Sequence, residues 1–291
     1  MPLSLVDVFD DYLAMLLKPP HGTGAAVNPC IDCKILFLRR ARERLEALGG
    51  GFLVTGEVLG QRPMSQNPQA LRTIAAAADC EDILLRPLSA RRLPPTRAER
   101  EGWVDRERLL DFSGRNRKPQ LALATRYGLD RIPQPAGGCI LTDAGFGRRF
   151  RDHLAHRQDE AGWTYEEIVR LRLGRHFRLP DGGKVMVGRH AGENDMLTRY
   201  RQGCGRVWSP AIPGPVTLFE PAASDAARAF ALGATARYAD APAGEPVLLK
   251  WEVGDTVHAA RVPGLPDETL AARRVGRNHA GGGSCRRARQ S

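Results

Sequence analysis

Phe52-Leu53-Val54-Thr55 and Ile83-Leu84-Leu85 are two short apolar runs that predict buried strands in the first half of the sequence. The residues between them, Asn67 to Ala78, predict a helix. A strand, a helix and a second strand in this order indicate a parallel pair joined by a crossover. Because ligands of such sheets bind where the strands end, the sequence predicts an α/β domain with a site at loops 56–66 and 86–90.

Two further helices are predicted before these strands. Apolar residues from Leu5 to Leu17 repeat at helical spacing until Lys18-Pro19-Pro20 stops the pattern. Residues Ile35 to Leu48 form an amphipathic pattern that ends at Gly49-Gly50-Gly51. The N-terminus of a helix carries partial positive charge, so thiols just before Ile35 are expected to ionise more readily.

Three cysteines have distinctive neighbours. Two lie in Asn28-Pro29-Cys30-Ile31-Asp32-Cys33-Lys34, and the third ends Pro135-Ala136-Gly137-Gly138-Cys139. Asn-Pro predicts an exposed turn that presents the first two thiols, and the glycines before Cys139 permit close backbone approach to a bulky ligand. A C-x-x-C pair fits a shared metal, a redox disulfide or half of a zinc site, and a lone cysteine is often a small buried hydrophobe. These alternatives stay open, whereas Cys80, Cys204 and Cys285 lack such neighbours.

Composition indicates a globular protein with room for two domains. The sequence has 291 residues, of which 42% are hydrophobic and 26% charged. Six cysteines without a dense framework are typical of a reducing cytoplasm, where we expect this protein. The start of the sequence resembles no signal peptide, and no membrane span is expected.

The formal charge of +10 favours a polyanionic partner, with nucleic acid as the first candidate. Six arginines of the Gly-rich C-terminal stretch contribute much of this excess, and that stretch is expected to be disordered. The body of the protein is therefore only mildly basic.

After about residue 150 the sequence predicts an α+β domain. Residues 174–179 and 184–190 read as two strands around Pro180-Asp181-Gly182-Gly183, which suits a hairpin turn. Helices over 192–201 and 223–234 and strand character over 246–257 follow. Val187-Gly188-Arg189 and Glu193-Asn194 resemble the RNA-binding module shared with ribosome-associated quality-control proteins.

The hairpin is rich in cations that suit an RNA backbone. Arg175, Arg178 and Arg189 are predicted to contact phosphates. His176 and His190 are compatible with metal binding, but RNA contact or a structural role is the preferred interpretation of each.

Several motifs in the first half together resemble the tRNA thiouridine synthases of the PP-loop ATPase superfamily, including proteins labelled tRNA (5-methylaminomethyl-2-thiouridylate)-methyltransferase. They are Asn28-Pro29-Cys30-Ile31-Asp32-Cys33-Lys34, residues 54–66, Arg86-Pro87-Leu88-Ser89-Ala90, Gly114-Arg115-Asn116-Arg117 and Pro135-Ala136-Gly137-Gly138-Cys139. The resemblance implies an incomplete Rossmann-like PP-loop parallel sheet over residues 1–150, followed by an α+β RNA-binding domain over 151–270 and a basic disordered tail over 271–291.

The resemblance also implies a mechanism. Such enzymes use ATP and Mg²⁺ to adenylate a tRNA uridine and then replace the activated oxygen with sulfur, which a donor protein or sulfide supplies. Cys33 and Cys139 match the two catalytic cysteines, and Cys30 completes a set that holds a 4Fe-4S cluster with one open iron; zinc is the alternative metal. Nucleotide or tRNA binding is implied for loop residues Gly56, Glu57, Arg62, Gln66, Arg86, Arg115 and Arg117, although arginines of this kind are often only solvated surface charge.

One departure from this family changes the expected activity. Its Ser-Gly-Gly-x-Asp-Ser phosphate loop is absent from the sequence, so the chain is expected to be N-terminally truncated. A misassigned start codon, a decayed gene, or a protein that borrows ATP binding from another chain would each account for this. Two rival functions therefore stand beside thiouridine synthesis. One is cluster-dependent removal of sulfur from thiouracil or thiouridine, and the other is RNA binding by a non-catalytic, zinc-stabilised protein.

Overall fold

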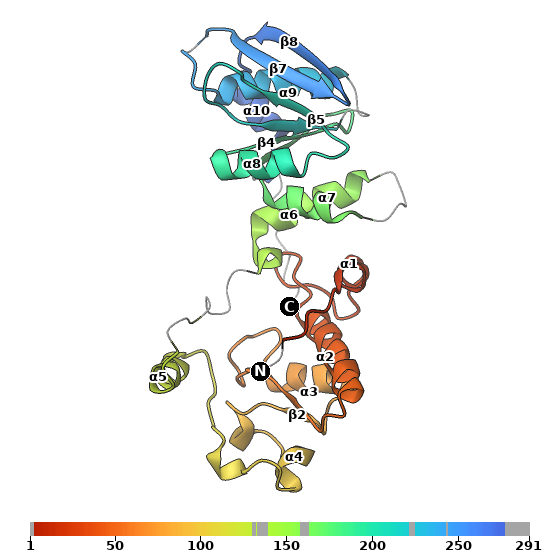
Figure 1. Ribbon diagram of the computed structural model, residues 1–291, viewed down its shortest axis with the longest axis vertical. Coiled ribbons are helices and arrows are strands. Elements are labelled where there is room, and N and C mark those ends of the chain that lie inside the picture. The colour runs from red at the N-terminus through yellow and green to blue at the C-terminus, as the bar shows by residue number, and fades with distance from the viewer. Residues whose placement is uncertain are drawn as a thin grey trace, which may run out of the picture. The chain divides into compact units, whose positions relative to one another are not determined.

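The computed structural model describes residues 3–129, 132, 139–157, 163–220, 225–242 and 244–276. The chain divides into two compact units, residues 1–144 and 145–291, which are described separately (Figure 1). Among the described helices, none has the length and apolar character that crossing a membrane requires.

The N-terminal unit contains helices around one small sheet. Its elements are α1 (Phe9–Leu17), α2 (Cys30–Ala47), β1 (Leu53–Val54), α3 (Pro68–Ala77), β2 (Leu84–Leu85), η1 (Ala90–Arg92), α4 (Arg97–Arg100), η2 (Arg106–Arg108), α5 (Lys118–Arg126) and η3 (Ile140–Thr142). Strands β1 and β2 pair in parallel with Leu53 opposite Leu84, as the sequence predicts. Helices α2 and α3 bury Leu38 and Ile74 against Leu84.

Of the predicted incomplete Rossmann-like PP-loop sheet, the described residues show only one parallel pair of strands. In the described part of the N-terminal unit, the sheet consists of two strands, each only two residues long. A doubly wound sheet is covered by helices on both faces, but Val54 of β1 is 58% exposed. The small sheet therefore lacks the second layer on which that fold depends.

Helices α2 and α3 both begin beside a proline, and α3 also has a side-chain cap. Helix α2 starts at Cys30, five residues before the predicted Ile35, directly after Pro29. Helix α3 starts at Pro68, and its N-cap Asn67 accepts a hydrogen bond from the Ala70 amide at 2.8 Å. Both starts lie at loops that carry predicted site residues.

The C-terminal unit is built on an antiparallel sheet with strand order β3-β4-β6-β5-β7-β8. Its elements are α6 (Ala144–His156), α7 (Tyr165–Arg172), β3 (Arg175–Arg178), β4 (Lys184–Val187), α8 (Ala191–Arg199), β5 (Gly205–Trp208), β6 (Thr217–Phe219), α9 (Asp225–Tyr238), β7 (Val247–Val253), β8 (Thr256–Val262) and α10 (Asp267–Arg273). The predicted hairpin is present as β3 and β4, where Gly182 has a φ of 89°. Glycine adopts this left-handed conformation without a steric cost.

Helices cover the two faces of this sheet to different extents. Helix α9 packs against one face and forms the main core with Phe177, Val207 and Leu249. On the other face, α7 and α8 bury Leu218 of β6 and Met186 of β4, and Figure 1 shows α8 beside β4. Helix α10 runs into the predicted tail, where the Val275 amide donates to the His176 carbonyl at 2.9 Å. Residues 277–291, including Cys285, lie outside the described residues.

Candidate functional sites

The three predicted thiols come together in the N-terminal unit. Cys30 and Cys33 lie in the first turns of α2, and Cys139 is the residue before η3. The Val27 amide donates to the Leu141 carbonyl at 3.2 Å, which ties the segment after Cys139 to the segment before Cys30. The glycines before Cys139 lie outside the described residues.

Tyr12 of α1 belongs to the same cluster. Its hydroxyl hydrogen-bonds to Cys33, and its ring stacks on Phe37 of α2 with the ring centroids 6.0 Å apart. Burial raises the pKa of the Cys33 thiol, and the neighbouring Cys139 and Cys30 thiols raise it further. The hydrogen bond from Tyr12 acts in the opposite direction and lowers the pKa. Burial also raises the pKa of Tyr12, and Cys33 adds to the effect. The sequence offered no signal for Tyr12, since its position depends on how α1 packs.

One local expectation about these thiols is wrong, and burial opposes another. Asn28 and Pro29 are buried. The side-chain amide of Asn28 points inward and donates to Cys30 Sγ at 3.2 Å and to Met64 Sδ at 3.3 Å. The Asn-Pro segment is therefore a buried support for the thiols and not an exposed turn. At Cys33 the expected effect of the helix N-terminus is opposed, because burial raises the pKa of the thiol.

The thiol cluster does not have the geometry of a closed single-metal site. Within the described residues, no group of three His, Cys, Asp or Glu side chains is placed to hold one metal ion. A four-iron cluster binds its cysteines through separate irons, so its ligands lie farther apart than those of one zinc ion. The converging thiols are soft donors of the kind that such a cluster uses. Cys80 and Cys204 stand apart from this cluster: Cys80 is buried and Cys204 is half-buried, and desolvation raises the pKa of each thiol.

The loops that follow β1 and β2 meet in the N-terminal unit. The Leu59 amide donates to Ser89 Oγ at 2.9 Å, and Ser89 Oγ donates to the Phe112 carbonyl at 2.7 Å. The Gly114 amide donates to the Leu59 carbonyl at 2.7 Å. Three loops far apart in the sequence therefore form one surface at the strand ends, as the parallel pair predicts.

Glu57 and Arg86 form a buried ion pair at this surface. Arg86 Nε donates to Glu57 Oε2 at 2.9 Å, and Lys34 of α2 pairs with the other oxygen. Burial alone would raise the pKa of Glu57, but Lys34 and Arg86 together hold it below its usual value. Because Arg86 also donates to the Leu71 carbonyl at 3.4 Å, its guanidinium is committed within the protein. This argues for a structural role of Arg86 over the predicted phosphate contact.

Replacing Glu57 with Gln should destabilise the N-terminal unit by about 3–5 kcal/mol, because two cations would lose their shared carboxylate. Hydrogen exchange of peptides covering β1 and β2 measures this effect locally. Glu101→Gln is the control, since Glu101 pairs with Arg97 at the surface and its loss should cost less than about 1 kcal/mol. Equal losses of stability in the two variants would show that the buried Glu57 pair stabilises the protein no more than a surface ion pair does.

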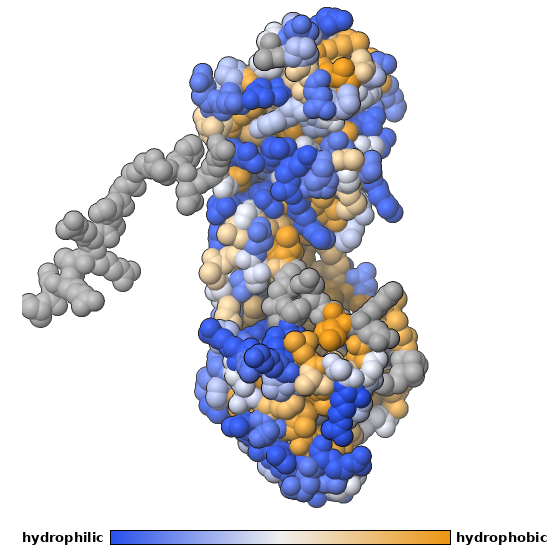
Figure 2. Space-filling model, turned by 90° about the vertical axis from the view of Figure 1, so that its left-hand side faces the viewer, coloured by the Kyte–Doolittle hydropathy of each residue, from blue (hydrophilic) through white to orange (hydrophobic). Residues whose placement is uncertain are grey.

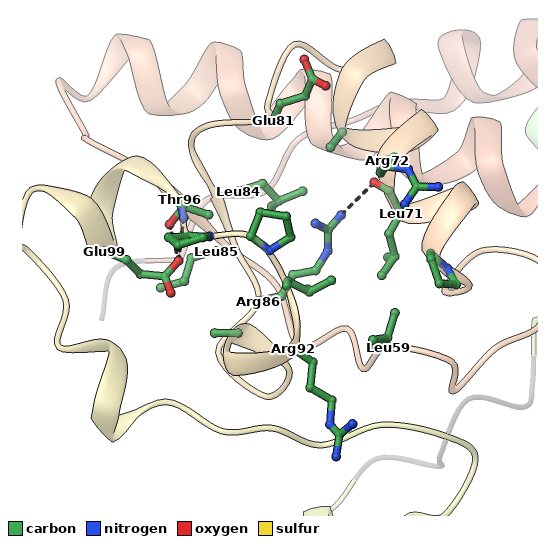
Figure 3. A pocket seen from close by; sticks show the side chains of 16 residues that line it. Leu59, Leu71, Arg72, Glu81, Leu84, Leu85, Arg86, Arg92, Thr96 and Glu99 are labelled. Carbon is green, nitrogen blue, oxygen red and sulfur yellow. Dashed lines mark hydrogen bonds between the residues drawn. The ribbon is translucent and has the colours of Figure 1, made fainter.

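A pocket of about 420 Å³ lies beside this ion pair (Figure 3). Leu71 of α3, Leu84 and Leu85 of β2 and Leu93 supply apolar walls. Arg86 crosses the pocket toward Leu71, whereas the capping-box pair Thr96 and Glu99 stands at another side (Figure 3). The pocket suits a small apolar group, and Arg86 is bound within the protein, although Arg72 and Arg92 also line the pocket.

The other predicted loop residues have different environments. Arg62, Arg115 and Gly56 are exposed. Gln66 is buried, and its backbone amide donates to the Arg62 carbonyl at 2.9 Å. Arg117 is half-buried, and its Nε and Nη1 have no hydrogen-bond partner among the described residues. Figure 2 shows hydrophobic side chains gathered on the displayed face of this unit.

The three predicted RNA-contacting arginines of the C-terminal unit fall into two groups. Arg175 lies over the Tyr238 ring at 4.5 Å, beside a hollow of about 370 Å³ that Arg189 and His190 also line. Arg189 is half exposed and pairs with buried Glu193, which it helps to hold at a pKa of about 2 against the effect of burial. Arg178 instead points to the other side of β3, where it donates to Asp152 Oδ2 at 2.7 Å and is 11% exposed.

A buried polar cluster around Lys184 gave no signal in the sequence. Lys184 is 2% exposed, and burial together with Arg178 lowers its pKa to about 8, although Asp152 lies 3.9 Å away. Burial and Lys184 also lower the pKa of His153 to about 3. His176 is fully buried, its Nε2 lies 2.7 Å from the Leu173 carbonyl, and burial lowers its pKa. These contacts show a structural role for His176.

Mild acid should therefore destabilise the C-terminal unit. His153 has a pKa of about 3 when folded and about 6.5 when unfolded. Because the unfolded chain binds the proton first, stability falls as the pH drops below about 6.5, by up to about 1.4 kcal/mol per pH unit. Urea midpoints at about pH 7 and about pH 5 measure the decline, which His153→Gln should reduce. His190→Gln is the control, since the His190 side chain is 67% exposed. If stability falls as much in His153→Gln as in the wild type, His153 is not the cause of the decline.

Comparison with known proteins assigns part of the C-terminal unit. The family model "NFACT protein RNA binding domain" matches residues 174–272, from the start of β3 to α10. Among solved structures, the C-terminal of the fibronectin/fibrinogen-binding protein from Streptococcus suis has 14% sequence identity and a TM-score of 0.32, covering 47% of this chain and 64% of that chain. This chain thus spans less than two thirds of that solved chain. No curated protein matches significantly.

These findings correct the expected family. The match covers an RNA-binding domain and not a PP-loop enzyme. In the described part of the N-terminal unit, two strands pair where a PP-loop sheet needs several. The expected membership of the tRNA thiouridine synthases is therefore wrong. The likeness of residues 187–194 to an RNA-binding module, by contrast, falls within the matched region.

Proposed function

We propose that this protein binds RNA through its C-terminal unit and that tRNA is its partner. The match of residues 174–272 to an RNA-binding domain carries the proposal. The geometry of Arg175 and Arg189 supports it, because both line the hollow where β3 and β4 meet the start of α8. Arginine side chains at such a surface contact phosphates and fix the position of an RNA backbone.

Binding of labelled tRNA to the whole chain, followed by fluorescence anisotropy at low salt, tests this proposal. Saturable binding that unlabelled tRNA displaces is the expected result. Failure of the folded protein to bind tRNA or any other RNA would overturn it.

The second proposed activity is binding of a 4Fe-4S cluster by Cys30, Cys33 and Cys139. The convergence of three thiols at the start of α2 supports it. Such a cluster, with three protein ligands, offers one iron to an external sulfur. Within the protein, the Tyr12 hydroxyl donates to Cys33, and the Asn28 amide donates to Cys30, so two of the three thiols have an oriented hydrogen-bond donor.

Transfer of sulfur to or from a uridine of the bound RNA is the finer function that these thiols support. Mass spectrometry of nucleosides from tRNA incubated with the iron-loaded protein tests both directions. Gain of thiouridine in the presence of sulfide, ATP and Mg²⁺ identifies a transferase, in which the uridine oxygen leaves on AMP. Loss of thiouridine with release of sulfide, where water supplies the oxygen, identifies desulfuration. An unchanged nucleoside content would show that the protein neither adds sulfur to tRNA nor removes it.

A further inference from the structure

The sheet of the C-terminal unit has one face that helices cover only in part. Residues in register share a face, so Met186, Leu218, Arg206, Glu252 and Val257 form one row across β4, β6, β5, β7 and β8. Helices α7 and α8 bury the first two members of this row. The row then becomes more exposed, and Val257 on β8 is 54% exposed. We call the β5, β7 and β8 part of this face the open half.

Neighbouring rows show which other side chains belong to the open half. Trp208 lies opposite Lys250, which lies opposite Ala259, and Leu248 lies opposite Arg261. Lys250, Ala259 and Arg261 are exposed, and Trp208 and Leu248 are half-buried. Small and apolar groups thus alternate with cations over three strands.

Cations outnumber carboxylates on this surface. Arg206, Lys250 and Arg261 share the open half with a single acid, Glu252. Glu252 is already bound by two arginines, since Arg206 Nε lies 3.0 Å from its Oε1 and Arg201 Nε lies 3.2 Å from the same oxygen. One carboxylate therefore serves two guanidinium groups, and the surface retains a positive charge.

An aromatic ring lies among these cations. The guanidinium of Arg206 lies over the Trp208 ring, 4.3 Å from its centroid. Indole rings and guanidinium planes are both surfaces on which unpaired bases stack. Beside them, a hollow of about 700 Å³ is lined by Arg199 and Arg201 on one side and by Glu252, Asp255 and Val257 on the other. The open half therefore combines a stacking group, cations and space.

We propose that the open half binds a single-stranded segment of RNA, with a base stacked on the Trp208–Arg206 pair and phosphates on Lys250, Arg261 and Arg201. The proposal rests on the proposed RNA-binding function and specifies its surface and the form of the RNA. A duplex suits this surface less well, because its bases are already stacked on one another and are not free to stack on Trp208. The open half is distinct from the hollow that Arg175 and Arg189 line, as the two share no lining residue.

The test compares a short labelled oligouridine with an RNA duplex of the same length, using the whole chain. Trp208→Ala should weaken oligouridine binding by about tenfold and duplex binding much less, and Trp208→Phe should retain most of the affinity. Oligouridine should also quench tryptophan fluorescence in the wild type and less in Trp208→Ala. Lys250→Glu should weaken oligouridine binding and reduce its dependence on salt, because a phosphate contact is lost.

The matched control for charge is Arg228→Glu. Arg228 lies on α9, which packs on the opposite face, and its partner among the described residues is the nearby Asp225, at 3.0 Å. It should bind oligouridine like the wild type. Lys250 is exposed, so Lys250→Glu keeps the test valid if Trp208→Ala fails to fold.

The outcomes separate this inference from the function on which it rests. If the wild type binds neither RNA, the proposed function itself fails. If the wild type binds RNA and both Trp208→Ala and Lys250→Glu bind oligouridine as well as it does, the RNA-binding function stands and the open half is not its site. Equal weakening of duplex and single-strand binding by Trp208→Ala would overturn the single-strand assignment.

Discussion

Binding of tRNA should weaken by roughly 10³-fold when the salt concentration rises from about 50 to about 200 mM, if about six phosphates are contacted. The reason is that each cation bound to a phosphate releases condensed counterions, and added salt opposes that release. The C-terminal unit offers cations in two places, the hollow with Arg175 and Arg189 and the open half with Lys250 and Arg261. Anisotropy titrations at several salt concentrations give the slope directly.

Charge reversal at Arg175 should lower both the affinity and the slope. Loss of one phosphate contact reduces the slope by about one. Arg175→Glu is more informative than Arg189→Glu, because Arg189 holds the buried carboxylate of Glu193 and its loss would disturb α8. Arg228→Glu again controls for the change in net charge. A flat salt dependence would mean that the basic groups of this unit are merely solvated.

Loss of any one of three thiols should abolish most of the iron-sulfur absorption. Protein prepared without oxygen is expected to be brown and to contain iron, because Cys30, Cys33 and Cys139 converge from two segments of the chain. A cluster with only two remaining protein ligands is not held. Iron content and visible absorption of Cys30→Ala, Cys33→Ala and Cys139→Ala measure the effect.

Cys204→Ala provides the control for this series. Cys204 packs near Tyr200 and Val216 in the C-terminal unit, so its replacement should leave the cluster intact. Circular dichroism shows whether each variant is folded. A colourless wild type that retains one tightly bound zinc ion would contradict the cluster and support the zinc-stabilised alternative.

The sequence alone determined the features that local patterns encode. Two strand-like runs around Pro180-Asp181-Gly182-Gly183 predicted the β3–β4 hairpin, because a turn needs a residue such as Gly182 with positive φ. Two apolar runs separated by a helical pattern predicted the parallel pair β1 and β2. The unusual neighbours of Cys30, Cys33 and Cys139 also identified three thiols that the structure brings together.

Only the tertiary structure decided what the charged and polar groups do, since their roles depend on partners that are distant in the sequence. Arg86 and Arg178 have the same side chain as Arg175, but Glu57 and Asp152 bind them in the interior. Cys33 lies at the start of a helix, where a thiolate is favoured, but burial raises the pKa of this thiol. The open half with Trp208 arises from the register of β5, β7 and β8, because pairing across strands, and not the order along the chain, places these residues on one face.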